Sequence, residues 1–172
     1  MSSFTGEIEQ RIDGKGRVSI PAAFRAALEK NDPEWSAGQP TRLYLQYSDD
    51  LNGFLRAWDV NSFERRQRQF QQWPSGPRKK LAIRYFFRQV QVILLDKDGR
   101  MVMPLKLRER LGVTGDDDLQ LRGLGDYFEL WRLETAEAED DHDALLAEMG
   151  PDFDPQEFAD MPPDPFPDSR ME

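Results

Sequence analysis

The stretch Asp13-Gly-Lys-Gly-Arg-Val-Ser-Ile-Pro-Ala-Ala-Phe-Arg-Ala-Ala-Leu28 returns 83 residues later as Asp96-Lys-Asp-Gly-Arg-Met-Val-Met-Pro-Leu-Lys-Leu-Arg-Glu-Arg-Leu111. The identities that keep this register are Asp13, Gly16, Arg17, Pro21, Arg25 and Leu28 with Asp96, Gly99, Arg100, Pro104, Arg108 and Leu111. Apolar positions recur between them, such as Val18 with Met101. Chance similarity does not keep a Gly, a Pro and two Arg in register, so the sequence predicts a duplicated supersecondary unit.

Each repeat predicts a β-hairpin followed by a short helix. Alternating residues from Ile8 to Ile12 predict a first strand, and Asp13-Gly-Lys-Gly16 is typical of a turn, because Asp accepts hydrogen bonds from nearby amides and Gly permits positive φ. Arg17 to Ile20 return as a strand. Pro21 suits the first position of a helix, where its missing N–H costs little. Each hairpin therefore carries an Arg just past its tip.

The rest of the chain up to residue 133 predicts further strands and a pair of helices. The strands are expected at residues 43–47, 54–58, 90–95, 119–122 and 128–131, and the helices at about 61–73 and 78–88. Asn61 with Glu64 three residues later is typical of a capping box, which predicts that the first helix opens at Asn61. Residues 54–58 align with residues 127–131 at an offset of 73, so the repeat extends beyond its core motif.

Composition excludes several classes of function. The 172 residues contain no Cys and one His, His142, so neither a thiolate metal site nor a nucleophile–base pair can form within the chain. The sequence therefore predicts no catalytic residue, no metal and no cofactor. No apolar run is long enough for a membrane span, and the N-terminus lacks a signal pattern. A reducing cytoplasm fits the absence of Cys.

The net charge of −9 hides an uneven distribution. Residues 134–172 hold fourteen Asp and Glu against one Arg, whereas residues 1–133 hold twenty-two Lys and Arg against eighteen acids. The body can therefore present a basic face to a polyanion. The acidic tail is predicted to contain a helix over residues 135–149 and a disordered Pro- and Asp-rich segment over residues 151–172. It is a solubilising appendage, a competitor for the basic face, or a binding segment for a protein partner.

A hairpin tipped by Asp-x-x-Gly-Arg and followed by a Pro-led helix resembles the SpoVT/AbrB-like DNA-binding unit. Two such hairpins, an opening Phe4-x-Gly-Glu7, a linking helical pair and Phe128-Glu-Leu-Trp131 together resemble the MraZ family over about residues 4–133. The resemblance implies an α+β fold in which two swapped-hairpin units form one pseudo-two-fold β-barrel with flanking helices. It also implies a homo-oligomeric ring and no enzymatic activity.

The same resemblance suggests a division of the chain into four parts. These are a first SpoVT/AbrB-like repeat at 6–60, a linking helical pair at 61–88, a second repeat at 89–133, and the acidic tail at 134–172. The implied function is bacterial transcriptional regulation of the protein's own promoter and of the division and cell-wall gene cluster, through short direct repeats in DNA. The protein is accordingly expected in the cytoplasm and at the nucleoid.

The candidate DNA-binding residues are cations at or near the hairpin tips: Arg17, Lys15, Arg100, Lys97 and Arg11. The resemblance implies that the Arg after the turn Gly contacts DNA, and a hairpin-borne Arg suits either phosphate or a guanine edge. Lys15 corresponds to Asp98 in the second repeat. This difference predicts that the first hairpin dominates DNA binding.

Other interpretations of the same residues stay open. Arg17 and Arg100 are also placed to pair with Asp13 and Asp96 across their turns, and Arg25 with Arg108 is expected to anchor the barrel or a subunit contact. The basic stripe formed by Lys80, Arg84 and Arg88 is a solvated helix face, a DNA contact or a subunit contact.

Two other functions compete with DNA binding. The first alternative is a ring-forming assembly protein whose acidic tail recruits a partner. The second is an antitoxin of similar fold, although such antitoxins usually carry one motif copy.

Overall fold

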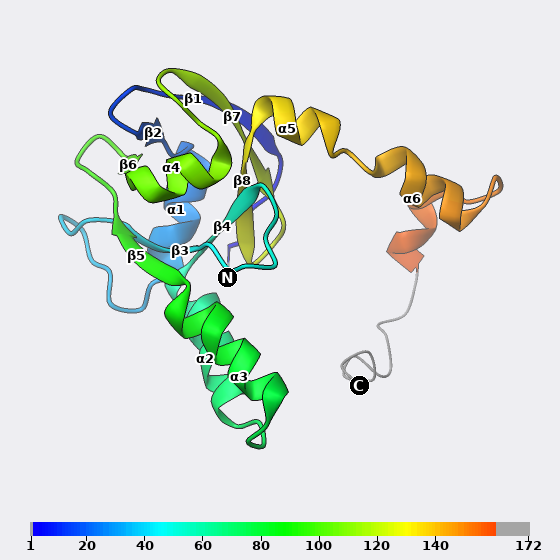
Figure 1. Cartoon of the computed structure of the whole chain (residues 1–172), viewed down its shortest axis with the longest axis horizontal. Helices are drawn as coiled ribbons and strands as arrows, with labels where there is room; N and C mark the ends of the chain where they lie inside the picture. Colours follow the sequence, from blue (N-terminus) through cyan, green and yellow to red (C-terminus); the bar gives the residue numbers. More distant parts are fainter. Residues whose placement is uncertain (1, 161–172) are drawn as a thin grey trace. The chain divides into compact units, whose positions relative to one another are not determined.

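The computed structural model describes residues 2–160 and is an α+β protein built on an eight-stranded antiparallel sheet, which curls into a nearly closed barrel (Figure 1). The chain divides into two compact units, Met1–Ala138 and Glu139–Glu172, and the barrel belongs to the first. None of the helices in residues 2–160 is both long enough and apolar enough to span a membrane.

The elements of the barrel follow the duplication in the sequence. The first repeat supplies β1 (Glu7–Ile12), β2 (Arg17–Ser19), α1 (Ala22–Lys30), β3 (Arg42–Gln46) and β4 (Phe54–Trp58). The second supplies β5 (Val90–Leu94), β6 (Arg100–Val102), α4 (Leu105–Leu111), β7 (Asp117–Gly123) and β8 (Tyr127–Arg132). The strand order is β5-β3-β4-β8-β7-β1-β2-β6. Every strand expected from the alternation of apolar residues is present.

The two repeats exchange strands. β1 of the first repeat pairs with β7 of the second, and β5 of the second pairs with β3 of the first. β2 pairs with β6, and β4 pairs with β8, so each of these pairs joins equivalent strands of the two repeats. The expected swapped-hairpin barrel is therefore confirmed, and neither repeat completes the sheet alone.

Strand register shows the pseudo-two-fold symmetry residue by residue. Between β4 and β8, Phe54 lies opposite Trp131, and Trp58 lies opposite Tyr127, with Arg56 opposite Glu129 at the centre. A shift of 73 residues turns the pair of Phe54 and Trp131 into the pair of Tyr127 and Trp58, and it maps the central pair onto itself. This is the offset that the sequence predicts for this segment. The Phe54 and Trp131 rings stack with centroids 4.4 Å apart.

The barrel interior is an apolar core drawn from both repeats. Phe4, Phe24 and Phe128 form a cluster of three rings with centroids 4.8–5.4 Å apart, and all three side chains are at most 2% exposed. One ring comes from the N-terminal segment, one from α1 and one from β8. Burial of these rings therefore joins three distant parts of the chain.

A helical pair links the repeats, and we use that name for residues 60–88. It consists of α2 (Val60–Gln71), α3 (Pro77–Ile83) and the π-helix η1 (Arg84–Arg88). The capping box predicted at Asn61 is wrong, because Asp59 caps α2 by accepting hydrogen bonds from the Ser62 amide at 2.7 Å and its hydroxyl at 2.8 Å. Phe70 and Phe86 pack against each other inside the pair, with centroids 4.6 Å apart.

Two helix starts and the tail differ from the sequence predictions. Pro21 and Pro104 occupy the N-cap positions of α1 and α4, so each helix begins one residue later than expected. The single acidic helix expected over residues 135–149 is two helices, α5 (Leu133–Ala138) and α6 (His142–Met149), separated by an Asp-rich break. Where disorder was expected, η2 (Pro155–Asp160) is a short 3-10 helix, and residues 161–172 lie outside the described residues.

Candidate nucleic-acid interface

The first hairpin turn is organised by the carboxylate of Asp13. Its Oδ1 accepts the backbone amides of Lys15 and Arg17, each at 2.9 Å, and its Oδ2 accepts the Nε of Arg17 at 2.6 Å. Gly16 closes the turn by donating to the Asp13 carbonyl at 3.0 Å, with a φ of 82° that favours glycine. The bond through Nε fixes the direction of the Arg17 side chain. Its two terminal nitrogens have no partner among residues 2–160.

The second turn repeats this arrangement with one addition. Asp96 accepts the backbone amides of Asp98 and Arg100 at 2.9 and 3.0 Å, and it accepts the Nε of Arg100 at 2.9 Å. A terminal nitrogen of Arg100 also donates to the carboxylate of Asp98 at 3.3 Å. The pairing of Arg17 and Arg100 with the turn carboxylates is therefore confirmed. Arg100 is held by two carboxylates, whereas Arg17 is held by one.

These hydrogen bonds stabilise the charged form of each turn carboxylate. The backbone hydrogen bond from Arg17 is the largest influence that holds the pKa of Asp13 below its ordinary 3.8, and the Arg17 side chain adds to it. The pKa of Asp96 is lowered in the same way by Arg100. A carboxyl whose pKa is lower in the folded state stabilises the fold above pH 3.8, and that contribution is lost as pH falls through the folded pKa.

We therefore expect the Asp13 carboxyl to titrate with a midpoint below 3.8 in an NMR pH titration of the folded protein. In Arg17→Ala the midpoint should move only part of the way back, because the backbone hydrogen bonds to Asp13 remain. The Asp96 carboxyl in the same variant serves as an internal control and should not move. An Asp13 midpoint at or above 3.8 would contradict the described turn.

Each turn lies against an Arg from the other repeat. The Nε of Arg108, on α4, donates to the Met103 carbonyl at 3.0 Å, and a terminal nitrogen reaches the Gly14 carbonyl at 3.4 Å. Arg25, on α1, lies over Gly99, where an added Cβ would overlap its guanidinium. The expectation that this Arg pair anchors the barrel is confirmed for Arg108 by these hydrogen bonds.

The paired strands β2 and β6 bring the two tip arginines onto one outward surface. Arg17 lies opposite Val102, and Arg100 lies opposite Ser19. The intervening Val18 and Met101 are buried in the core, so the other four side chains point outward. Arg17 and Arg100 are thus diagonal neighbours on adjacent strands, a position in which Cα atoms lie roughly 7–8 Å apart. Both are about one-third exposed.

The other sequence candidates surround this surface unevenly. Lys15 is exposed at the first tip, and Lys97 is exposed at the second, where it stands between Asp96 and Asp98. Arg11 lies on β1 opposite Asp118 and has its guanidinium 4.0 Å from the carboxylate of Asp116. The positive charge of Arg11 is therefore balanced by its own surroundings, unlike that of Lys15.

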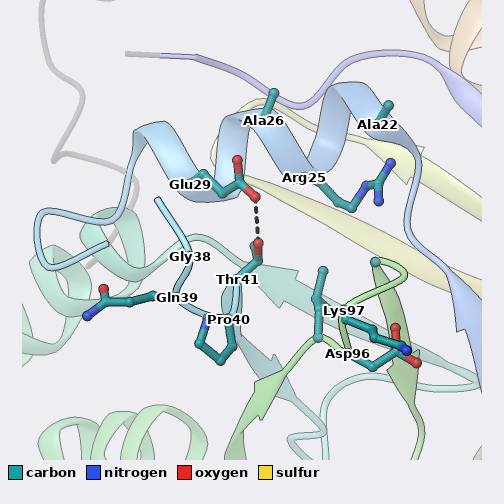
Figure 2. Close-up of a pocket in the computed structure, with 12 residues that line it drawn as sticks. Ala22, Arg25, Ala26, Glu29, Gly38, Gln39, Pro40, Thr41, Asp96 and Lys97 are labelled. Carbon is teal, nitrogen blue, oxygen red and sulfur yellow. Dashed lines mark hydrogen bonds between the residues drawn. The ribbon is translucent and has the colours of Figure 1, made fainter. Parts of the chain in front are cut away.

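A groove beside the second turn adds another difference between the repeats. It has a volume of about 540 Å³ and lies between α1 and the turn, with Ala22, Arg25 and Lys97 in its lining (Figure 2). Leu105 and Glu109 take the positions equivalent to Ala22 and Ala26 in the second repeat. The small side chains of α1 therefore help leave this space open.

Sequence reasoning did not find the contact between Arg108 and the first turn, which spans 94 residues. The recurrence of Arg25 as Arg108 was the available signal, but it does not say which turn each Arg meets. The sequence also did not show that Asp98 holds Arg100. It did show that the second repeat has Asp98 at the position where the first repeat has Lys15.

Two interleaved hairpin–helix units with outward cations define the class of duplicated swapped-hairpin barrel proteins. A family model described as "MraZ protein, putative antitoxin-like" matches residues 3–76. The transcriptional regulator MraZ of Ruegeria sp. (strain TM1040) is 36% identical over 160 residues, which cover 91% of this chain and 95% of the relative. The chain therefore belongs to the MraZ family of transcriptional regulators, a non-enzymatic family.

Other relatives agree with this membership. The transcriptional regulator MraZ of Ruegeria pomeroyi is 33% identical over 160 residues, with the same shares of the two chains covered. The protein of that name from Bacteroides thetaiotaomicron is 32% identical over 141 residues, which cover 80% of this chain and 83% of the relative. The similarity therefore spans both repeats and is not confined to a single hairpin.

Proposed function

We propose that this transcriptional regulator binds DNA sequence-specifically through its two hairpin tips. The observation that carries the proposal is the orientation of Arg17, whose Nε is held by Asp13 while both terminal nitrogens stay free of partners within residues 2–160. A guanidinium in this state offers two parallel donors to a guanine edge or to a phosphate. Fixing the side chain in advance lowers the entropic cost of binding.

The proposed contact set is Arg17 and Lys15 at the first tip, with Arg100, Lys97 and Arg11 in lesser roles. The asymmetry follows from charge. The first turn carries two cations and one acid, whereas the second carries two cations and two acids. Asp98 also accepts a hydrogen bond from one terminal nitrogen of Arg100, whereas the equivalent nitrogen of Arg17 stays available to a ligand.

The proposed target is the DNA upstream of the protein's own gene, within the division and cell-wall gene cluster, where short direct repeats would each receive one subunit. A homo-oligomeric ring, acting at the nucleoid in the cytoplasm, would present the tips repeatedly and gain affinity by avidity. Apolar side chains on the barrel support self-association, since Val92 and Leu94 of β5 are 47% and 59% exposed.

The division of labour along the chain is part of the proposal. Residues 6–60 and 89–133 act as the two DNA-binding repeats, residues 61–88 as their link, and residues 134–172 as an acidic segment for a protein partner. The charge of that segment, fourteen acids against one Arg, supports a basic partner surface.

Footprinting on DNA upstream of the gene tests the proposed function. Wild-type protein should protect several short segments at a regular spacing, and protection should weaken as salt rises because phosphate contacts release counterions. A shuffled duplex of equal length is the control. Oligomers that leave the upstream DNA unprotected at low ionic strength would instead identify a ring-forming assembly protein.

A further inference from the structure

The helical pair, residues 60–88, is the most basic part of the molecule. It contains eight Lys and Arg against one acid, Glu64, a net charge of +7. The remainder of residues 1–133 holds fourteen bases against seventeen acids. The positive balance of the body therefore comes from this helical pair, and the strands that carry the hairpin tips do not supply it.

Most of these cations are not neutralised by the fold. Arg84 pairs with Asp49 at 2.8 Å and Arg65 with Asp126 at 3.5 Å, and no other base of the helical pair has a carboxylate partner within residues 2–160. Lys80 and Arg88 are exposed and line one shallow surface cavity of about 480 Å³ together with Lys79 and Ser75. Lys79 is tied to the Gln71 carbonyl at 3.0 Å.

The chemistry of this face favours a nucleic acid over a protein partner. The cores of protein–protein interfaces are apolar and depleted of charge, but the one exposed large hydrophobic residue of the helical pair is Leu81. Protein–DNA interfaces are more polar and much more positive. Unpaired cations spread along two helices match the repeated charges of a phosphate backbone, and Leu81 is the one exposed large apolar side chain that they leave to a folded partner.

The helical pair also faces away from the hairpin tips. Strand β5 begins just after η1 and ends at the second turn, so the helical pair and that turn lie at opposite ends of one strand. Figure 1 shows α2 and α3 projecting from the barrel on the side away from both turns. A duplex segment held by the tips is therefore not the segment that this face would meet.

We propose that the helical pair is a second nucleic-acid surface, which binds the phosphates of duplex DNA without reading its sequence. Lys80 and Arg88 are its central contacts, with Arg68 and Arg78 as outer contacts. The proposal goes beyond the promoter recognition assigned to the tips. It predicts that the protein engages a flanking or second segment of DNA, which raises general affinity and leaves the choice of site to Arg17.

Fluorescence anisotropy with a promoter duplex and a shuffled duplex tests the proposal on the full chain. Lys80→Gln with Arg88→Gln should lower affinity for the shuffled duplex on the order of tenfold and flatten its log–log salt slope by about 2. The ratio of promoter to shuffled affinity should stay equal or rise. Replacement of the same two residues by Glu should deepen the loss, and circular dichroism confirms folding.

The matched control is Lys30→Gln with Lys106→Gln, which changes the net charge equally at exposed lysines of α1 and α4. The proposal is overturned if the helical-pair variant binds the shuffled duplex as tightly as the control variant does. A fall in oligomer mass with unchanged DNA affinity also overturns it, since the face would then be a contact between subunits. Arg17→Ala should instead lower the promoter ratio, so failure of tip recognition and failure of this face give different results.

Discussion

Replacement of Arg17 by alanine should lower affinity for the promoter on the order of 100-fold at physiological salt. One well-oriented bidentate contact contributes about 1–3 kcal/mol of discrimination, and its loss recurs in every subunit that engages a repeated site. Arg100→Ala should cost less, about tenfold or below, because Arg100 has one donor already committed to Asp98. Quantitative band-shift titrations with promoter and shuffled duplexes measure both losses.

Two further variants sharpen this comparison. Lys30→Ala removes an exposed cation of α1 and should leave promoter affinity within about twofold. Asp98→Lys gives the second tip the cation that Lys15 supplies to the first and releases Arg100, so promoter binding should tighten several-fold. A larger loss from Arg100→Ala than from Arg17→Ala would refute the dominance of the first tip.

Phe128→Ala should be the most destabilising single truncation, with a loss of about 3–5 kcal/mol in the free energy of unfolding. Phe128 is fully buried on β8 and contacts both Phe4 and Phe24, so its removal leaves a cavity where three segments of the chain meet. A loss of this size is a large part of the roughly 5–15 kcal/mol that stabilises a typical domain. Urea unfolding followed by circular dichroism measures it.

The control for this prediction is a phenylalanine outside the core. Phe158 is 59% exposed, so Phe158→Ala should change the free energy of unfolding by no more than about 0.5 kcal/mol. If Phe128→Ala costs less than about 1 kcal/mol, the surrounding rings have moved to fill the space. The cluster would then not be the rigid centre that the packing indicates.

Local features of the barrel were predictable because they depend on residues close together in the chain. Asp13 and Gly16 determine a turn within four residues, and the same pattern at Asp96 and Gly99 shows that the turn is used twice. The offset of 73 also showed that residues 54–58 and 127–131 are equivalent, whereas the pairing of β4 with β8 came from the structure. The start of α2 was mispredicted from the spacing of Asn61 and Glu64. The residue that caps the helix is Asp59, a buried carboxylate that accepts the Ser62 amide.

The sequence by itself determined the duplication, the two turns with their outward arginines, and the concentration of positive charge in residues 60–88. Tertiary structure alone decided that β1 pairs with β7 and that Arg108 meets the carbonyl of Gly14. The physical reason is the range of the forces involved. Turn chemistry and periodicity act over a few residues, whereas strand exchange is selected by which apolar faces leave water together across the whole chain.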